Sequence, residues 1–121
     1  MTRGGGHRVE RIGALVHQTV AAALATEVKD PRVGFVTITR VKMSSDGGHA
    51  LLMVSVLGSP EEQTKALEGL NSARGFLRTR LAQSLSLRVA PDVHFELDRG
   101  LEHARNIDRV LQELEKKDEA E

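Results

Sequence analysis

The sequence of 121 residues contains no cysteine, no tryptophan and no tyrosine. Without cysteine, the chain cannot form disulfides, thiolate nucleophiles or zinc and iron–sulfur sites with cysteine ligands. The only aromatic residues are Phe35, Phe76 and Phe95, which excludes a surface that stacks several bases on aromatic rings. The hydrophobic core is therefore expected to be aliphatic.

Long apolar runs are also missing. The longest one, from Ala50 to Leu57, is interrupted by Ser55 and is far shorter than the roughly 20 residues of a membrane span. Residues 1–6 are polar and rich in glycine, and no apolar segment of a signal peptide follows them. These features predict a single domain in the cytoplasm, with no membrane contact.

The formal net charge is zero, but the charges are unevenly distributed along the chain. Residues 1–90 contain 12 basic and 7 acidic residues, whereas residues 91–121 contain 5 basic and 10 acidic residues. The first segment therefore carries a net charge of +5 and the second −5. This asymmetry predicts a basic binding body with an acidic end. The segment between Leu70 and Ala90 has four arginines and no acidic residue.

The first half of the chain predicts one helix and a β-hairpin. Apolar residues three and four positions apart indicate a helix over residues 7–27, which Asp30-Pro31-Arg32 ends because proline disfavours helical geometry in the preceding residue. β-Branched residues indicate a strand over residues 33–43. Residues 50–57 indicate a second strand that is apolar at nearly every position, so both of its faces are expected to be covered. The Asp-Gly turn between the strands predicts antiparallel pairing.

The middle of the chain predicts two helices that meet at a kink. Ser59 with Glu62 forms a capping-box pattern, and Pro60 occupies the first helical position. The helical pattern weakens over residues 71–75, which contain asparagine, serine and glycine, and resumes at Phe76. We expect one helix up to about Asn71 and a second helix that starts near Ala73.

The last part of the chain completes an α+β domain. Residues 93–98 alternate between apolar and polar, which predicts a half-buried third strand, and residues 101–114 predict an amphipathic final helix. The order is α-β-β-α-kink-α-β plus a C-terminal helix, in two layers. We expect a disordered arm at 1–6, one domain at 7–114 and a charged tail at 115–121.

The kink is the best candidate for a binding site. A helix that starts near Ala73 would direct backbone N–H groups at a phosphate, and Gly75 would allow close backbone approach. Arg74 and Arg78 are four residues apart and share one face. The other contributors are uncharged donors or more distant cations: Asn71, Ser72, Thr79, Arg80, which points elsewhere, and Arg88, beyond the helix end. This pattern predicts contacts to a nucleic-acid backbone without base reading; the alternative is an ordinary solvated helix face.

Catalytic motifs are absent from the sequence. The five histidines form no short metal-ligand spacing, and no nucleotide-binding or hydrolase motif occurs. Glu96 and Asp98 lie on the same face of the third strand, but an exposed polar strand face explains them. We therefore expect no enzymatic activity, no metal and no cofactor. Two alternatives remain: an acidic final helix that binds a basic protein, and a small hydrolase using His94 or His103.

Several stretches occur in an order and spacing that is specific as a set. They are Arg8-Val9 with Ile12; Asp30-Pro31-Arg32; Val36-Thr37-Ile38-Thr39-Arg40-Val41; His49-Ala50; Val54-Ser55-Val56-Leu57-Gly58; Ala73-Arg74-Gly75 with Phe76-Leu77-Arg78; Leu87-Arg88; Pro91; and Phe95 with Asp98. Over roughly residues 7–112, this pattern resembles the bacterial ribosome-binding factor A family.

The resemblance implies a type II K-homology-like (KH-like) fold in which an Ala-x-Gly kink replaces the usual GxxG loop. It also implies a non-catalytic factor that binds the small (30S) ribosomal subunit. We expect no small-molecule substrate, and we expect a monomer because no apolar stripe in the sequence remains unassigned. Such a factor assists late maturation and 5′-end processing of 16S ribosomal RNA (rRNA) and supports growth in the cold. By position, the resemblance assigns Ala73, Arg74 and Gly75 to the kink, and a further set to a basic face: Arg78, Arg80 and Arg88, with Arg8, Arg11, Lys29, Arg32, Arg40 and Lys42 as additional phosphate contacts. The family usually has serine where this chain has Gly100.

Overall fold

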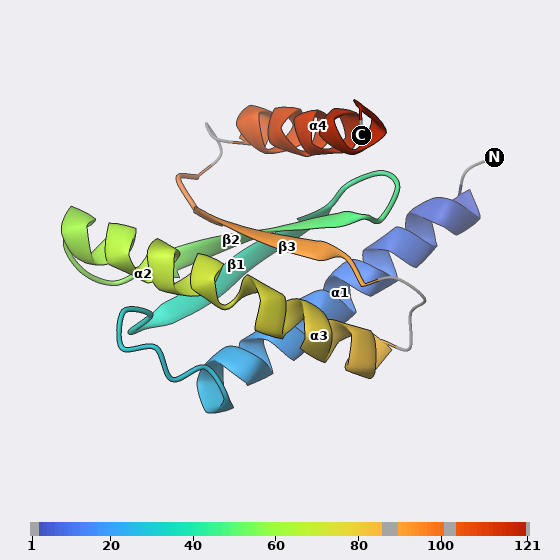
Figure 1. The fold of residues 1–121 in the computed structure, drawn as a ribbon. Coiled ribbons are helices and arrows are strands. Elements are labelled where there is room, and N and C mark those ends of the chain that lie inside the picture. Colours follow the sequence, from blue (N-terminus) through green and yellow to red (C-terminus); the bar gives the residue numbers. More distant parts are fainter. Residues whose placement is uncertain (1–2, 86–89, 101–103, 121) are drawn as a thin grey trace.

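The computed structural model describes residues 3–85, 90–100 and 104–120 (Figure 1). Its elements, in chain order, are α1 (Arg3–Thr26), β1 (Val36–Met43), β2 (His49–Val56), α2 (Pro60–Ser72), α3 (Arg74–Leu85), β3 (Asp92–Leu97) and α4 (Ala104–Ala120). The predicted element order is confirmed, and the fold is α+β.

The sheet has the strand order β1-β2-β3. β1 pairs with β2 antiparallel, whereas β2 pairs with β3 parallel, so α2 and α3 form the crossover between the two parallel strands. Helices α1, α2 and α3 cover one face of the sheet, and α4 lies on the opposite face (Figure 1). The sequence predicted two layers, but α4 adds a third layer over the part of the sheet that it covers.

Strand β2 is the centre of the core. Leu52 and Val54 point towards α1 and α3 and pack in the main aliphatic cluster. Leu51 and Met53 point the other way and pack against Ile107 and Leu111 of α4, together with the partly buried Leu114. The two clusters explain why the second strand is apolar at nearly every position, as we expected from the sequence.

Local sequence signals determine where the turn of the hairpin lies and where α2 begins. In the turn, the carboxylate of Asp46 accepts hydrogen bonds from Gly48 N–H at 2.8 Å and from the Ser44 hydroxyl at 2.7 Å. At the start of α2, the Ser59 hydroxyl accepts from Glu62 N–H, and the Glu62 carboxylate accepts from Ser59 N–H. The predicted capping box is therefore present.

Helix α1 begins earlier than expected. The structure starts it at Arg3, so residues 3–6 are helical where the sequence predicted a disordered arm. The prediction followed hydrophobic periodicity, which starts only at Val9. Once a helix exists, each added residue gains a hydrogen bond without a new nucleation cost, so the polar residues 3–6 can extend it.

The C-terminal helix ends later than expected. Helix α4 continues to Ala120 and includes residues 115–120, which the sequence assigned to a charged tail. Glutamate and lysine are good helix formers, and two acidic side chains of this segment also contact the β1–β2 hairpin. Glu115 accepts a hydrogen bond from the Ser45 hydroxyl at 2.8 Å, and Asp118 lies 2.5 Å from the Nε2 atom of His49.

Candidate nucleic-acid interface

The break between α2 and α3 lies at Ala73, where the sequence predicted that one helix ends and a second begins. Ala73 caps α2 with φ −88° and ψ −1°. Its N–H donates to the carbonyls of Gly69 at 3.2 Å and Leu70 at 3.1 Å. Its own carbonyl accepts from Leu77 N–H at 2.9 Å, which starts the hydrogen-bond pattern of α3. The two helices therefore share Ala73, and Arg74 is the first residue of α3.

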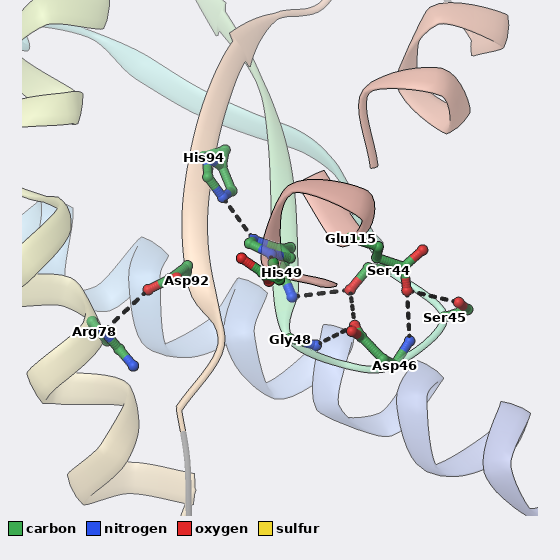
Figure 2. Close-up of polar contacts among 10 residues, drawn as sticks. Ser44, Ser45, Asp46, Gly48, His49, Arg78, Asp92, His94 and Glu115 are labelled. Atoms are coloured by element: carbon green, nitrogen blue, oxygen red, sulfur yellow. Dashed lines mark hydrogen bonds and ion pairs between the residues drawn. The ribbon is translucent and has the colours of Figure 1, made fainter. Parts of the chain in front are cut away.

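Arg74 and Arg78 lie on the side of α3 that faces β3. Arg78 Nη1 is 3.3 Å from Asp92 Oδ1 at the start of β3 (Figure 2), and about half of each side chain is exposed. Among the described residues, nothing accepts a hydrogen bond from the buried Nε atom of Arg74. An exposed ion pair contributes only about 0–1 kcal/mol, so a phosphate can compete with Asp92 for Arg78. This side of the junction therefore offers two cations to a polyanion.

Arg80 points away from this pair, as the helical spacing predicted. Its guanidinium forms an ion pair with Glu27, the residue that follows α1, and donates to Gln83 at 3.1 Å. The same guanidinium lies over the ring of Phe76, 5.6 Å from the ring centre. These contacts hold Arg80 between α1 and α3, so the structure does not join it to Arg74 and Arg78.

The additional predicted cations are spread over several elements. Arg32 lies next to the kink, because its Nη2 atom donates to Ser72 at 3.2 Å. Lys42 lies 4.0 Å from Asp108 of α4, and Arg40 pairs in register with Met53, whose side chain packs under α4. Cross-strand partners share a face, so Arg40 and Lys42 lie on the sheet face opposite α3.

The remaining predicted residues lie as follows. Asn71 and Ser72 are exposed at the end of α2, Arg11 is exposed on α1, and Lys29 is exposed between α1 and β1. Arg88 and the side chain of Arg8 lie outside the described residues. The structure therefore brings together residues 71–78 and Arg32, and it separates Arg40 and Lys42 from them.

A row of contacting polar side chains that runs from β3 through β2 to α4 was not predicted from the sequence. His94 Nε2 lies 3.0 Å from His49 Nδ1 (Figure 2), and His49 Nε2 contacts the Asp118 carboxylate. His49 is almost completely buried, because only 4% of its side chain is exposed. The partners lie 45 and 69 residues from His49 in sequence, so no local pattern reveals them.

The described residues contain no group of three or more histidine, aspartate or glutamate side chains placed to hold a metal ion. The two nitrogens of His49 point to different partners rather than to one common point. Within the same described residues, no helix combines the length and apolar character that crossing a bilayer requires.

This chain is similar to known proteins in both sequence and fold. The family model described as "Ribosome-binding factor A" matches residues 8–111. The chain belongs to the ribosome-binding factor A family. One family member, from Thermomicrobium roseum, is 45% identical over 109 residues, which cover 90% of this chain and 84% of the relative.

Solved structures of ribosome-binding factor A agree with this assignment. The crystal structure of the Thermus thermophilus protein has a TM-score of 0.67 and 25% identity, and covers 75% of this chain and 96% of its own. A homology model of the Thermus thermophilus protein, fitted into a cryo-EM map of its complex with the 30S subunit, has a TM-score of 0.61 and 26% identity, and covers 74% and 94%. The expected KH-like fold is therefore confirmed.

Gly75 offers a test of the ribosome-binding factor A kink. A Cβ atom at Gly75 would meet nothing within 4 Å, so the helix itself does not need glycine there. We expect Gly75→Ala to stabilise the fold by about 0.5–1 kcal/mol, because alanine is the better helix former. If an RNA backbone approaches at Gly75, the same change weakens RNA binding. Thermal unfolding and filter binding measure the two effects; an unchanged RNA affinity would contradict the close approach.

The pH dependence of stability tests the burial of His94. Burial lowers the pKa of His94 to about 4, and electrostatic interactions with Arg74 and His49 act in the same direction, against those with Asp92 and Asp118. The unfolded state therefore binds this proton more tightly, so stability is lost as the pH falls from about 6.5 to about 4. Because the ring is half-buried, solvent screening leaves a loss of about 1–2 kcal/mol. His94→Gln should flatten the stability profile over this range; a slope that survives would assign the loss to another group.

Proposed function

We propose that the chain binds the small (30S) ribosomal subunit by contacting 16S rRNA phosphates at the α2–α3 junction. The observation that carries this proposal is the pair Arg74 and Arg78, placed on one face immediately after the break at Ala73. A relative fitted into a 30S complex supports the choice of partner. Phosphate contacts position a protein on RNA without reading its bases, which suits a chain with few aromatic side chains.

The proposed role is assistance of late subunit maturation, including 5′-end processing of 16S rRNA, in the cytoplasm and during growth in the cold. The chain acts as a monomer and without catalysis of its own, so processing is left to nucleases. The family assignment supports this role. Binding to the maturing subunit would act by favouring one RNA conformation over others.

A sucrose-gradient experiment tests the proposal. The tagged chain is expected to migrate with free small subunits and to be absent from translating ribosomes. A strain without the protein should accumulate small subunits with unprocessed 16S rRNA 5′ ends, more strongly in the cold. A chain that stays at the top of the gradient at low salt, where phosphate contacts are strongest, would contradict the proposal.

The alternative to the proposed function is that the acidic helix α4 binds a partner protein. Three of its carboxylates already contact the chain's own β1–β2 hairpin: Asp108 faces Lys42, Glu115 accepts from Ser45, and Asp118 contacts His49. These contacts favour α4 as a cover of the sheet. A truncation after Leu101 that abolishes ribosome association, with no effect of changes at the kink arginines, would favour the alternative.

A further inference from the structure

The segment Asp30–Val33 packs directly on the last turn of α2. A Cβ atom at Gly69 would lie 3.0 Å from Val33 Cγ2, 3.2 Å from Arg32 Cβ and 3.4 Å from Asp30 Cγ. No larger residue fits there without movement of the segment. The backbone of α2 therefore touches the α1–β1 connection one turn before the break at Ala73.

An ion pair fixes the orientation of Arg32 in this segment. Arg32 Nε lies 3.0 Å and 3.2 Å from the two Asp30 carboxylate oxygens, and Arg32 Nη2 lies 2.6 Å from Oδ2. The Arg32 backbone N–H also donates to the same carboxylate at 2.9 Å. These contacts lower the pKa of Asp30 to about 2, so the pair stays charged throughout the physiological pH range.

The same guanidinium reaches the kink. Arg32 Nη2 donates to Ser72 Oγ at 3.2 Å, and Ser72 is the last residue of α2. Asp30, Arg32 and Ser72 thus form a hydrogen-bonded clamp between the α1–β1 connection and the end of α2. Three of the guanidinium's four described hydrogen bonds go to Asp30, which also neutralises its charge. Arg32 is therefore a weaker phosphate contact than its charge alone suggests.

We propose that Asp30 and Arg32 are positioning residues for the RNA-binding kink. The clamp holds the end of α2 and so sets the direction in which the first turn of α3 presents Arg74 and Arg78. This inference rests on the proposed function, because it assumes that the kink is the RNA surface. A binding site works only when neighbouring contacts hold its side chains within a fraction of an ångström.

Two variants with the same change of charge separate positioning from simple electrostatics. Asp30→Asn and Glu68→Gln each remove one negative charge near Arg32, since Glu68 also acts on Arg32 through its charge. Only Asp30→Asn removes the carboxylate that orients the guanidinium. If charge alone mattered, both variants would bind isolated small subunits equally well or better. We expect Asp30→Asn to bind about fivefold to tenfold more weakly, and Glu68→Gln to bind at least as well as the unchanged chain.

Milder variants keep the test valid if Asp30→Asn is unstable. Arg32→Lys keeps the charge but loses the planar fork, and Ser72→Ala removes only the bond to the kink. Both should weaken binding while the slope of log affinity against log salt stays unchanged, because no phosphate contact is lost. A fall of that slope by about one unit in an Arg32→Gln variant would identify Arg32 as a phosphate contact and overturn the proposal.

The amide resonances of Ala73, Arg74 and Gly75 give a readout that needs no RNA. They should shift in Ser72→Ala and Arg32→Lys and stay unchanged in Glu68→Gln. Unshifted resonances with full binding would disprove the clamp. Loss of binding in the clamp variants but not in Arg74→Glu would instead disprove the kink as the RNA surface, and so the proposed function.

Discussion

Replacing Arg74 and Arg78 together by glutamate is expected to weaken binding to isolated small ribosomal subunits on the order of a hundredfold at moderate salt. Each change replaces an attraction to phosphate by a repulsion on the same face of α3. The slope of log affinity against log salt should fall by roughly 1.5 units, because two phosphate contacts disappear. Sedimentation at four or more salt concentrations measures both quantities.

The fold should survive this double change. Neither side chain belongs to the hydrophobic core, although Arg74 is partly buried and glutamate at position 78 would face Asp92 and repel it. The matched control is Arg109→Glu with Lys116→Glu, which reverses two charges on exposed positions of α4. The control variant should bind like the unchanged chain. Equal losses in both variants would show that only the overall charge matters, and so would remove the kink as the specific surface.

The second large effect is expected from Gly69→Val. The first carbon of the new side chain would already lie 3.0 Å from Val33 Cγ2 and 3.2 Å from Arg32 Cβ, and two further methyl groups would follow it. Overpacking of this kind costs about 3 kcal/mol, which lowers the melting temperature by roughly 10 °C in a domain of this size. Calorimetry or circular dichroism is the suitable measurement, because the chain has no tryptophan fluorescence.

Gly75→Val is the matched control for this change. It makes the same substitution six residues later, at a site where a Cβ atom meets nothing within 4 Å. Its effect on stability should stay within about 0.5 kcal/mol, since valine and glycine have similar helix propensities. Similar losses at both glycines would show that the kink itself, rather than the contact with residues 30–33, requires glycine.

Local signals made much of the fold predictable. The Asp-Gly turn, the capping box at Ser59 and the break near Ala73 each depend on residues within a few positions of one another. The doubly covered second strand was also predictable, because only burial on both faces explains its composition. The same logic placed Arg74 and Arg78 on one face of a helix.

Contacts between distant residues were not predictable from the sequence. Arg32 and Ser72 lie 40 positions apart, and His49 and Asp118 lie 69 apart. The sequence therefore grouped Arg32 with the free cations and assigned the residues around Asp118 to a solvated tail. One signal was present: Gly69 interrupts a helical pattern, and such a glycine often marks close packing. Geometry was needed to show which segment it contacts.

The parallel pairing of β2 with β3 has a consequence for biosynthesis. The junction at Ala73 lies between two neighbouring strands, and its support from β3 exists only after residues 92–97 have paired with β2. Pairing between such distant segments forms late in folding. A nascent chain whose β3 has not yet emerged from the exit tunnel therefore lacks the contacts of α2 and α3 with β3, so we expect the proposed phosphate-binding surface to be complete only after β3 has docked.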